Sequence, residues 1–275
     1  MSEVSPLPVF PAAQRWSELL SGWGIPDHIL DQAPEPPWRH DPARFAVDDT
    51  LDRNTNSARW ARQVLPPVGG TVLDVGCGGG RSSIALVPPA NELIGVDSSG
   101  AMLDHYLDAA ARVGVARRTI HGEWPAVSPS TPVADVVVCH HVAYNVADIV
   151  PFLWALTDHA RLAVVLEIPT LHPMSAWSPG WRRFWGVERP FGPTFDDLQA
   201  VLREIGIDPE VTTSPRARAS GYESDPRTLV PVARRRLCLP AARDAELAEW
   251  LAEHPPPWAD TMATFRWPGS AETPF

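Results

Sequence analysis

The chain has 275 residues, 44% of them hydrophobic and 20% charged, which is the composition of a globular protein able to bury a core. It carries 33 Asp and Glu against 23 Lys and Arg, and the resulting net charge of −10 argues against nucleic acid as the main partner. All 23 basic residues are Arg, so protein kinases, Walker-type phosphate loops and pyridoxal enzymes, which need a Lys, are excluded.

The N-terminal 60 residues predict a partly helical cap. Residues 14–20 form a short helix with Trp16 and Leu19 on one face, a turn follows at 22–26, and residues 51–65 predict a longer helix. The opening residues show no such pattern, and we expect the start of the chain to be flexible. We therefore expect two parts, a cap at 1–60 and a domain at 61–275.

From residue 71 onward, predicted strands alternate with predicted helices. The strands at 133–139 and 162–168 are almost entirely apolar, as is typical of parallel strands buried on both faces. The pattern predicts an α/β fold with helices on both faces of a mostly parallel sheet. The expected strands are 71–76, 92–96, 117–121, 133–139, 162–168, 210–214 and 262–267, and the expected helices are 81–87, 99–113, 147–159, 195–205, 227–236 and 243–252.

A glycine-rich turn follows the first of these strands, with the pattern Asp-x-Gly-x-Gly-x-Gly over residues 74–80. Glycine lets a backbone approach a ligand closely, and open α/β sheets bind ligands at this edge. The dinucleotide pattern Gly-x-Gly-x-x-Gly fails, because its sixth position is Arg81 counted from Gly76 and Ser83 counted from Gly78. This argues against a nucleotide-dependent oxidoreductase. Asp74 would suit an ammonium group or an ordered water better than a pyrophosphate.

Acidic residues also follow the next two strands. Asp97 ends the strand at 92–96, where a carboxylate can accept both hydroxyl groups of a ribose. Glu123 follows the third strand and can accept a hydrogen bond from the amino group of an adenine. Trp124, next to it, can stack on the adenine ring or offer its backbone N–H.

At these residues the chain resembles the class I, Rossmann-like methyltransferases that use S-adenosylmethionine (SAM). The resemblance covers residues 64–205, and residues 22–26 and 234–239 resemble an actinobacterial group of these enzymes. It implies a seven-stranded sheet whose last two strands form an antiparallel hairpin. The helical insertion expected at about 220–258, between these two strands, is a departure from the family pattern. It also implies SAM as cofactor and S-adenosylhomocysteine (SAH) as product. The implied cofactor contacts are Asp74, Gly76, Cys77, Gly78, Gly80, Asp97, Ser98, Met102, Glu123, Trp124 and His140.

Candidate catalytic residues follow the fourth and fifth strands. Methyl transfer from a sulfonium is an in-line displacement, and an oxygen or nitrogen nucleophile can also need a base. His140 and His141 follow the fourth strand and would point in opposite directions if the strand continues. Glu167 lies near the end of the fifth strand and His172 in the loop after it. The alternative for His140 and His141 is that they only shape the pocket or cap the next helix. The alternative for Glu167 is a paired carboxylate, and for His172 a surface position.

Aromatic residues are the candidates for acceptor binding. Tyr144 follows the fourth strand, while Trp177 and Trp181 lie on one helix face in the Pro- and Trp-rich excursion at 170–192. That face is either a lid over a flat or apolar acceptor or a surface that packs on the sheet. The arginines between 216 and 236 form either a nucleic-acid surface or a helix face balanced by acids.

The features together predict a cytoplasmic, SAM-dependent enzyme that methylates oxygen or nitrogen of a small-molecule acceptor. Cys77, Cys139 and Cys238 form no Cys-x-x-Cys pair, and the histidines show no zinc-binding spacing, so we expect no metal. No apolar run of about 18 residues and no secretory signal is apparent, so we expect no membrane partner. An RNA or protein methyltransferase and a non-catalytic SAM-binding protein remain the alternatives.

Overall fold

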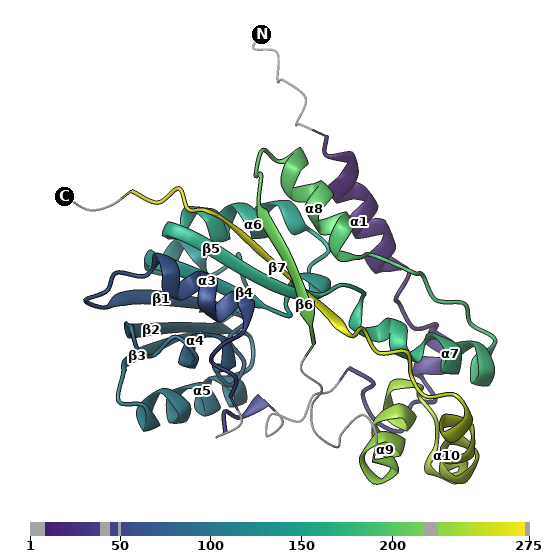
Figure 1. The fold of residues 1–275 in the computed structure, drawn as a ribbon. Helices are drawn as coiled ribbons and strands as arrows, with labels where there is room; N and C mark the ends of the chain where they lie inside the picture. Colours follow the sequence, from purple (N-terminus) through teal and green to yellow (C-terminus); the bar gives the residue numbers. More distant parts are fainter. Residues whose placement is uncertain (1–8, 39–44, 49–50, 217–224, 273–275) are drawn as a thin grey trace.

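The computed structural model describes residues 9–38, 45–48, 51–216 and 225–272. Its centre is one seven-stranded sheet in the order β3-β2-β1-β4-β5-β7-β6, in which only β7 runs antiparallel to its neighbours (Figure 1). This confirms the predicted α/β fold and the antiparallel last hairpin. The strands are β1 (Gly70–Val75), β2 (Ala90–Asp97), β3 (Ala116–His121), β4 (Ala134–His140), β5 (Ala160–Pro169), β6 (Glu210–Pro215) and β7 (Thr261–Pro268).

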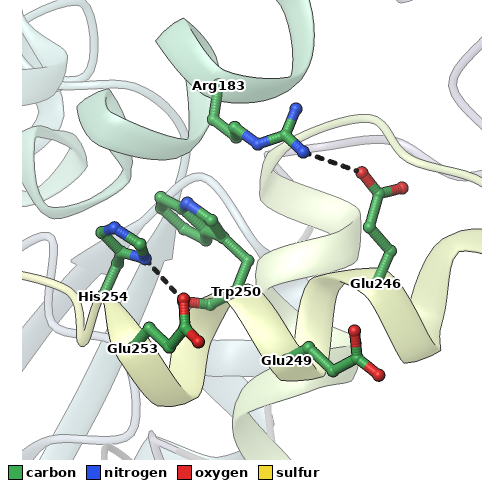
Figure 2. A pocket seen from close by; sticks show the side chains of 6 residues that line it. All are labelled: Arg183, Glu246, Glu249, Trp250, Glu253 and His254. Atoms are coloured by element: carbon green, nitrogen blue, oxygen red, sulfur yellow. Dashed lines mark hydrogen bonds and ion pairs between the residues drawn. The ribbon is translucent and has the colours of Figure 1, made fainter.

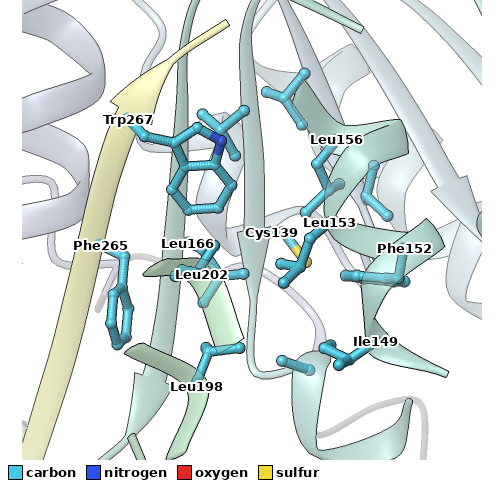
Figure 3. Packing of buried hydrophobic residues seen from close by; sticks show 14 of the residues in the cluster. Cys139, Ile149, Phe152, Leu153, Leu156, Leu166, Leu198, Leu202, Phe265 and Trp267 are labelled. Atoms are coloured by element: carbon cyan, nitrogen blue, oxygen red, sulfur yellow. The ribbon is translucent and has the colours of Figure 1, made fainter. Parts of the chain in front are cut away.

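Helices cover both faces of the sheet, as the alternation of strands and helices predicts. Successive side chains of β4 point to opposite faces, so Val137 and Cys139 join one core and Val136 and Val138 the other. The α6 face (Figure 3) is covered by α1 (Pro11–Ser21), α6 (Ile149–Asp158) and α8 (Phe195–Glu204), and the α5 face by α3 (Asn56–Val64), α4 (Arg81–Ile84) and α5 (Gly100–Arg112).

The N-terminal helix α1 packs into the same core as the sheet. Trp16 is fully buried, its indole N–H donates to the Val146 carbonyl at 2.8 Å, and its ring stacks on Tyr144. The expected cap therefore contributes to the main hydrophobic core through Trp16. Residues 1–8, which belong to the start of the chain that we expect to be flexible, lie outside the described residues.

A third apolar cluster lies beyond the end of the sheet where β5 ends and β7 begins. It is formed around Trp181 and Leu237 by α2 (Asp27–Leu30), α7 (Ser178–Trp185), α9 (Pro226–Arg236) and α10 (Asp244–Glu253). Figure 1 shows α7, α9 and α10 grouped together at this end. The helices α9 and α10 are the predicted insertion, and its ends meet because the Arg216 N–H donates to the Asp260 carbonyl at 2.7 Å.

Two helices are shorter than the sequence predicts. The helix expected at 51–65 starts at Asn56, because the Thr55 hydroxyl accepts a hydrogen bond from the Ala58 N–H and caps it there. The helix expected at 81–87 ends at Ile84. Within the described residues, we find no helix with the length and apolarity needed to cross a membrane.

Candidate active site

The glycine-rich turn joins β1 to α4 at the ligand-binding edge of the sheet. Both the Gly76 and the Cys77 N–H groups donate to the Val96 carbonyl, at 2.8 and 3.0 Å, which fastens the turn to β2. Gly78 has a φ of 49°, a left-handed conformation that favours glycine. A Cβ added at Gly78 would meet only the Phe45 ring, at 3.9 Å, so a ligand can approach the backbone there.

Asp97 holds this turn with its carboxylate. One oxygen accepts a hydrogen bond from the Gly78 N–H and the other from the Ser99 N–H, both at 2.9 Å. A carboxylate can accept about four hydrogen bonds, so each oxygen keeps capacity for one more donor. Asp97 is only half-buried and can therefore accept two neighbouring hydroxyl groups, as the sequence predicts for a ribose.

The loops after β2 and β3 bring other predicted cofactor residues to the same place. The Gly122 N–H donates to the Asp97 carbonyl at 3.0 Å, and a His121 ring nitrogen lies 2.9 Å from the Ser98 carbonyl. These contacts hold the exposed Glu123 next to the end of β2. Met102 lies in the first turn of α5 and is half-buried.

Trp124 does not present its ring as an adenine platform. Its indole N–H donates to the Phe152 carbonyl at 3.3 Å, and its ring meets His159 edge-on at 4.9 Å. These contacts hold the indole against α6. Of the two roles that the sequence offered for Trp124, the backbone N–H is the one compatible with this position.

Asp74 is fully buried at the end of β1 and faces α4. One carboxylate oxygen accepts hydrogen bonds from the hydroxyl groups of Ser82 and Ser83, both at 2.7 Å, and the other oxygen has no partner within the described residues. Burial raises the pKa of the Asp74 carboxyl, against the opposing effect of the two serine hydroxyls and of His140. The free oxygen fits the predicted role towards an ammonium group or a water. No sequence pattern pointed to a role for either serine, although both lie in the first turn of the helix that follows the glycine-rich turn.

Cys77 lies in the same turn with its thiol buried. Burial and the nearby carboxylates of Asp74 and Asp97 raise the pKa of this thiol well above its usual value. The side chain therefore packs in the α5-face core, and only the Cys77 backbone can contact a cofactor.

Three polar side chains lie side by side on the α5 face of neighbouring strands. His140 on β4 is directly opposite Glu167 on β5, which is directly opposite Thr264 on β7. The Thr264 hydroxyl donates to Glu167 at 3.1 Å, while the buried Nε2 atom of His140 has no partner within the described part of the chain. A ring nitrogen with unused hydrogen-bonding capacity next to a carboxylate can take or release a proton, so both predicted residues stay candidates.

His141 departs from the alternation that the sequence predicts. Strand β4 ends at His140, and His141 adopts a φ of 63° while its N–H donates to the Glu167 carbonyl at 2.8 Å. The His141 side chain is exposed to solvent. Desolvation lowers the pKa of His141, Glu167 opposes this, and electrostatic interactions with His140 and Arg216 lower it further. A neutral histidine open to solvent can act as a base.

His172 is buried, so it is not the surface histidine that the sequence offered as the alternative. Its Nδ1 atom accepts a hydrogen bond from the Met174 N–H at 3.2 Å, and its ring stacks on Trp23 at 4.3 Å. Desolvation lowers its pKa to about 4, although a hydrogen bond to the Tyr144 backbone opposes this effect. The ring also meets Tyr144 edge-on at 5.2 Å, so it links the N-terminal part to the loops after β4 and β5.

We expect the substitution His172→Asn to remove a pH-dependent part of the stability. Because the pKa in the folded state lies near 4, below the unfolded value of about 6.5, the stability is present above pH 6.5 and is lost as the pH falls towards 4. The loss between pH 7 and 4.5 is about 2 kcal/mol in the wild type. Urea unfolding at several pH values should show a flatter profile for His172→Asn, whose amide oxygen can still accept from Met174. The exposed His254→Asn is the control and should keep the wild-type profile.

The three aromatic residues predicted to contact the acceptor lie in the core instead. Tyr144 is buried and donates its hydroxyl to the Pro169 carbonyl at 2.8 Å, and burial raises the pKa of this phenol. Trp177 and Trp181 are 4% and 1% exposed, and both pack in the cluster formed with α9 and α10. Neither the predicted lid nor packing on the sheet is seen, because the inserted helices cover this face.

Two hollows are lined by described residues. A partly enclosed cavity of about 80 Å³ lies where β5 ends and is lined by Pro169, His172, Pro173, Ala176, Arg216, Trp258 and Ala259. A wider groove of about 440 Å³ lies between α7 and α10 and is lined by Arg183, Glu246, Glu249, Trp250, Glu253 and His254 (Figure 2). None of the predicted site residues lines this groove. No group of three His, Cys, Asp or Glu side chains in the described ranges is arranged to hold a metal ion.

The arginines of α9 have partners within the protein. Arg234 pairs with Asp244 at 2.8 Å, Arg235 lies 3.9 Å from Glu35, and Arg236 donates to a backbone carbonyl at 2.8 Å. These contacts fit the predicted helix face balanced by acids. Arg218, from the same run, lies outside the described residues.

A short segment at 45–48 lies over the glycine-rich turn. A Cβ added at Gly79 would approach the Phe45 carbonyl oxygen to 2.1 Å, so this position needs a glycine to admit the segment. Arg112 on α5 donates to the Val47 carbonyl at 2.7 Å and holds the segment in place. No sequence pattern in the turn indicated this contact.

Comparison with known proteins agrees with this arrangement. Residues 72–161 match the family described as methyltransferase domain, and no curated protein matches the chain significantly. The structure is similar to the YcgJ protein of Bacillus subtilis, with 16% identity, a TM-score of 0.53 and coverage of 79% of this chain and 98% of that one. It is also similar to a putative methyltransferase of Bacillus halodurans, with 14% identity, a TM-score of 0.52 and coverage of 78% and 98%. Residues 72–161 thus match a methyltransferase domain, and the glycine-rich turn and the sheet order of the chain agree with the Rossmann-like fold of class I methyltransferases, the enzymes that use SAM as methyl donor.

Proposed function

We propose that the chain transfers the methyl group of SAM to an oxygen or nitrogen atom of a small-molecule acceptor. The observation that supports SAM as the cofactor is the half-exposed Asp97 carboxylate. It is held by the Gly78 and Ser99 N–H groups and can accept hydrogen bonds from two more hydroxyl groups. A hollow of about 80 Å³ lies next to the polar residues of β4 and β5 and offers space for part of such an acceptor.

The residues that would hold the cofactor fit it chemically. Asp97 would accept the two ribose hydroxyls, the free oxygen of Asp74 would accept the amino group directly or through a water, and Glu123 would accept the adenine amino group. When bound, SAM supplies an electrophilic methyl carbon on a positively charged sulfur. Much of the catalysis then depends on how the protein aligns the acceptor atom with that carbon.

Proton removal from the acceptor would fall to the histidines after β4. As the new bond to the methyl carbon forms and the carbon–sulfur bond breaks, the acceptor loses the proton of its O–H or N–H group. His141 is open to solvent and favours its neutral form, so its ring nitrogen would take this proton. Glu167 would stabilise the resulting imidazolium, since its carboxylate raises the pKa of His141.

Calorimetry with SAM, SAH and NAD tests the cofactor side of this proposal. We expect SAM and SAH to bind and NAD to show no heat of binding. Binding of NAD in place of SAM would contradict the proposal.

Transfer of a labelled methyl group tests the acceptor class. The protein is incubated with methyl-labelled SAM and, separately, with the small-molecule, RNA and protein fractions of a cell extract. Label is expected only in the small-molecule fraction. Label in RNA or protein would support those alternatives instead, and SAM binding without transfer to any fraction would support a non-catalytic binding protein.

A further inference from the structure

The segment 45–48 lies directly against the glycine-rich turn. A Cβ added at Gly79 would approach the Phe45 carbonyl oxygen to 2.1 Å, so the backbone of the segment touches the turn at Gly79. The Phe45 ring lies beside the preceding residue, because a Cβ added at Gly78 would meet only this ring, at 3.9 Å. The ring therefore borders the space in front of Gly78, the residue whose N–H donates to the Asp97 carboxylate.

Two arginines hold the segment in this position. Arg112, the last residue of α5, donates to the Val47 carbonyl at 2.7 Å. Arg81, the first residue of α4, donates to the Ala46 carbonyl at 3.5 Å and lies 3.9 Å from the Asp48 carboxylate. The Val47 side chain also packs against the α5-face core. The segment is thus attached to the two helices next to the glycine-rich turn, and these attachments fix its place relative to the turn.

Phe45 keeps part of its apolar surface in water, since it is 36% exposed. A single exposed apolar side chain is ordinary, but this one borders the backbone that carries the predicted cofactor contacts. A cofactor that binds to Asp97 and passes Gly78 would cover the ring and remove this apolar area from water, which favours binding. Aromatic rings contribute more to such contacts than smaller apolar side chains, because they bury more area.

We propose that the Phe45 ring forms one wall of the cofactor site and contacts bound SAM or SAH. The inference adds a residue from the N-terminal 60 residues to a site that is otherwise built from the loops after β1, β2 and β3. It also gives Gly79 a role, because only a residue without a side chain lets the backbone of the segment come this close to the turn. The inference rests on the proposed use of SAM.

The first test measures SAH binding to the full chain by calorimetry. Phe45→Ala should weaken SAH binding about tenfold, the equivalent of about 1.4 kcal/mol. The matched control is Phe191→Ala, which removes a phenylalanine that is 76% exposed and does not border the glycine-rich turn, and it should bind SAH like the wild type. Thermal unfolding shows that each variant is folded.

A second variant displaces the segment without removing the ring. The added methyl group of Gly79→Ala would push the Phe45 backbone away, and Gly79 does not have a positive φ, so alanine is not strained there by its own backbone. Gly79→Ala should weaken SAH binding by about the same factor as Phe45→Ala. The double variant should be no weaker than either single variant, because both remove the same contact.

Isotope-filtered NMR tests the contact itself. Protein with ¹³C-labelled phenylalanine is saturated with unlabelled SAH, and we expect nuclear Overhauser effects between SAH protons and one phenylalanine ring, which disappear in Phe45→Ala at saturating SAH. A residue that only supported the turn would show no such effect.

Four outcomes overturn the inference while SAH binding to the wild type remains. They are unchanged SAH binding in Phe45→Ala, tighter binding in that variant, a double variant weakened by the product of the two single factors, and no Overhauser effect from the Phe45 ring. Tighter binding would mean that the ring occupies the space of the cofactor. Failure of the wild type to bind SAH would instead contradict the proposed function itself.

Discussion

Replacement of Asp97 by Asn is expected to weaken the binding of both SAH and 5′-methylthioadenosine about 100-fold. The Asp97 carboxylate accepts the Gly78 and Ser99 N–H groups, and an amide can accept with only one of its two atoms. The variant therefore loosens the glycine-rich turn and removes an acceptor for a ribose hydroxyl. Hydrogen bonds to charged groups contribute about 1.5–3 kcal/mol, so a loss of about 2.7 kcal/mol corresponds to this factor. Calorimetry with both ligands measures it.

The matched control for Asp97 is Asp104→Asn, an exposed acidic residue on α5. It should bind both ligands like the wild type. Thermal unfolding of each variant shows whether the fold persists. An Asp97→Asn variant that is folded and binds SAH as the wild type does would remove this carboxylate from the cofactor site.

Replacement of Asp74 by Asn is expected to affect the binding of SAH but not that of 5′-methylthioadenosine. The free oxygen of Asp74 is assigned to the amino group of the cofactor, which SAH carries and 5′-methylthioadenosine lacks. Asp74→Asn should therefore weaken SAH binding more than about tenfold while it leaves 5′-methylthioadenosine binding unchanged. Equal weakening of both ligands would show that Asp74 acts only by supporting the turn through Ser82 and Ser83.

The same variant has an expected effect on stability with a defined sign. Burial raises the pKa of the Asp74 carboxyl, so its contribution to stability is present at pH values below its unfolded pKa and is lost as the pH rises through the folded pKa. The unfolding free energy of Asp74→Asn should therefore improve relative to the wild type as the pH increases from about 4 to neutrality. Urea unfolding across this range measures the difference, and a difference that stays constant with pH would contradict the raised pKa.

The sheet was predictable because its signals are local. The apolar stretches that became β4 and β5 and the glycine-rich turn after β1 can each be recognised within about ten residues. Asp97 could be predicted from a local signal too. An acidic residue at the end of the second strand of a strand–helix–strand unit reaches the glycine-rich turn that follows the first strand. The residues proposed for the cofactor could therefore be named from local sequence signals, except for Phe45, which reaches the turn from a distant segment.

The acceptor side depends on contacts between distant segments, which local patterns do not encode. Trp177 and Trp181 form an apolar helix face, but the helices that cover it lie some fifty residues later in the chain. His172 is covered by Trp23 from the N-terminal part, which stacks on its ring. Arg216 and Trp258 line one cavity only because the insertion brings its two ends together. No spacing rule connects such pairs.

The insertion between β6 and β7 leaves and rejoins the sheet at neighbouring points. The Arg216 N–H donates to the Asp260 carbonyl, and the adjacent residues Pro215 and Thr261 are already in register as the last pair of the hairpin. An exchange of the segment between them for one of another length would therefore leave the strand pairing and the glycine-rich turn unchanged. The inserted helices can in this way vary in length and sequence while the sheet that carries the glycine-rich turn stays the same.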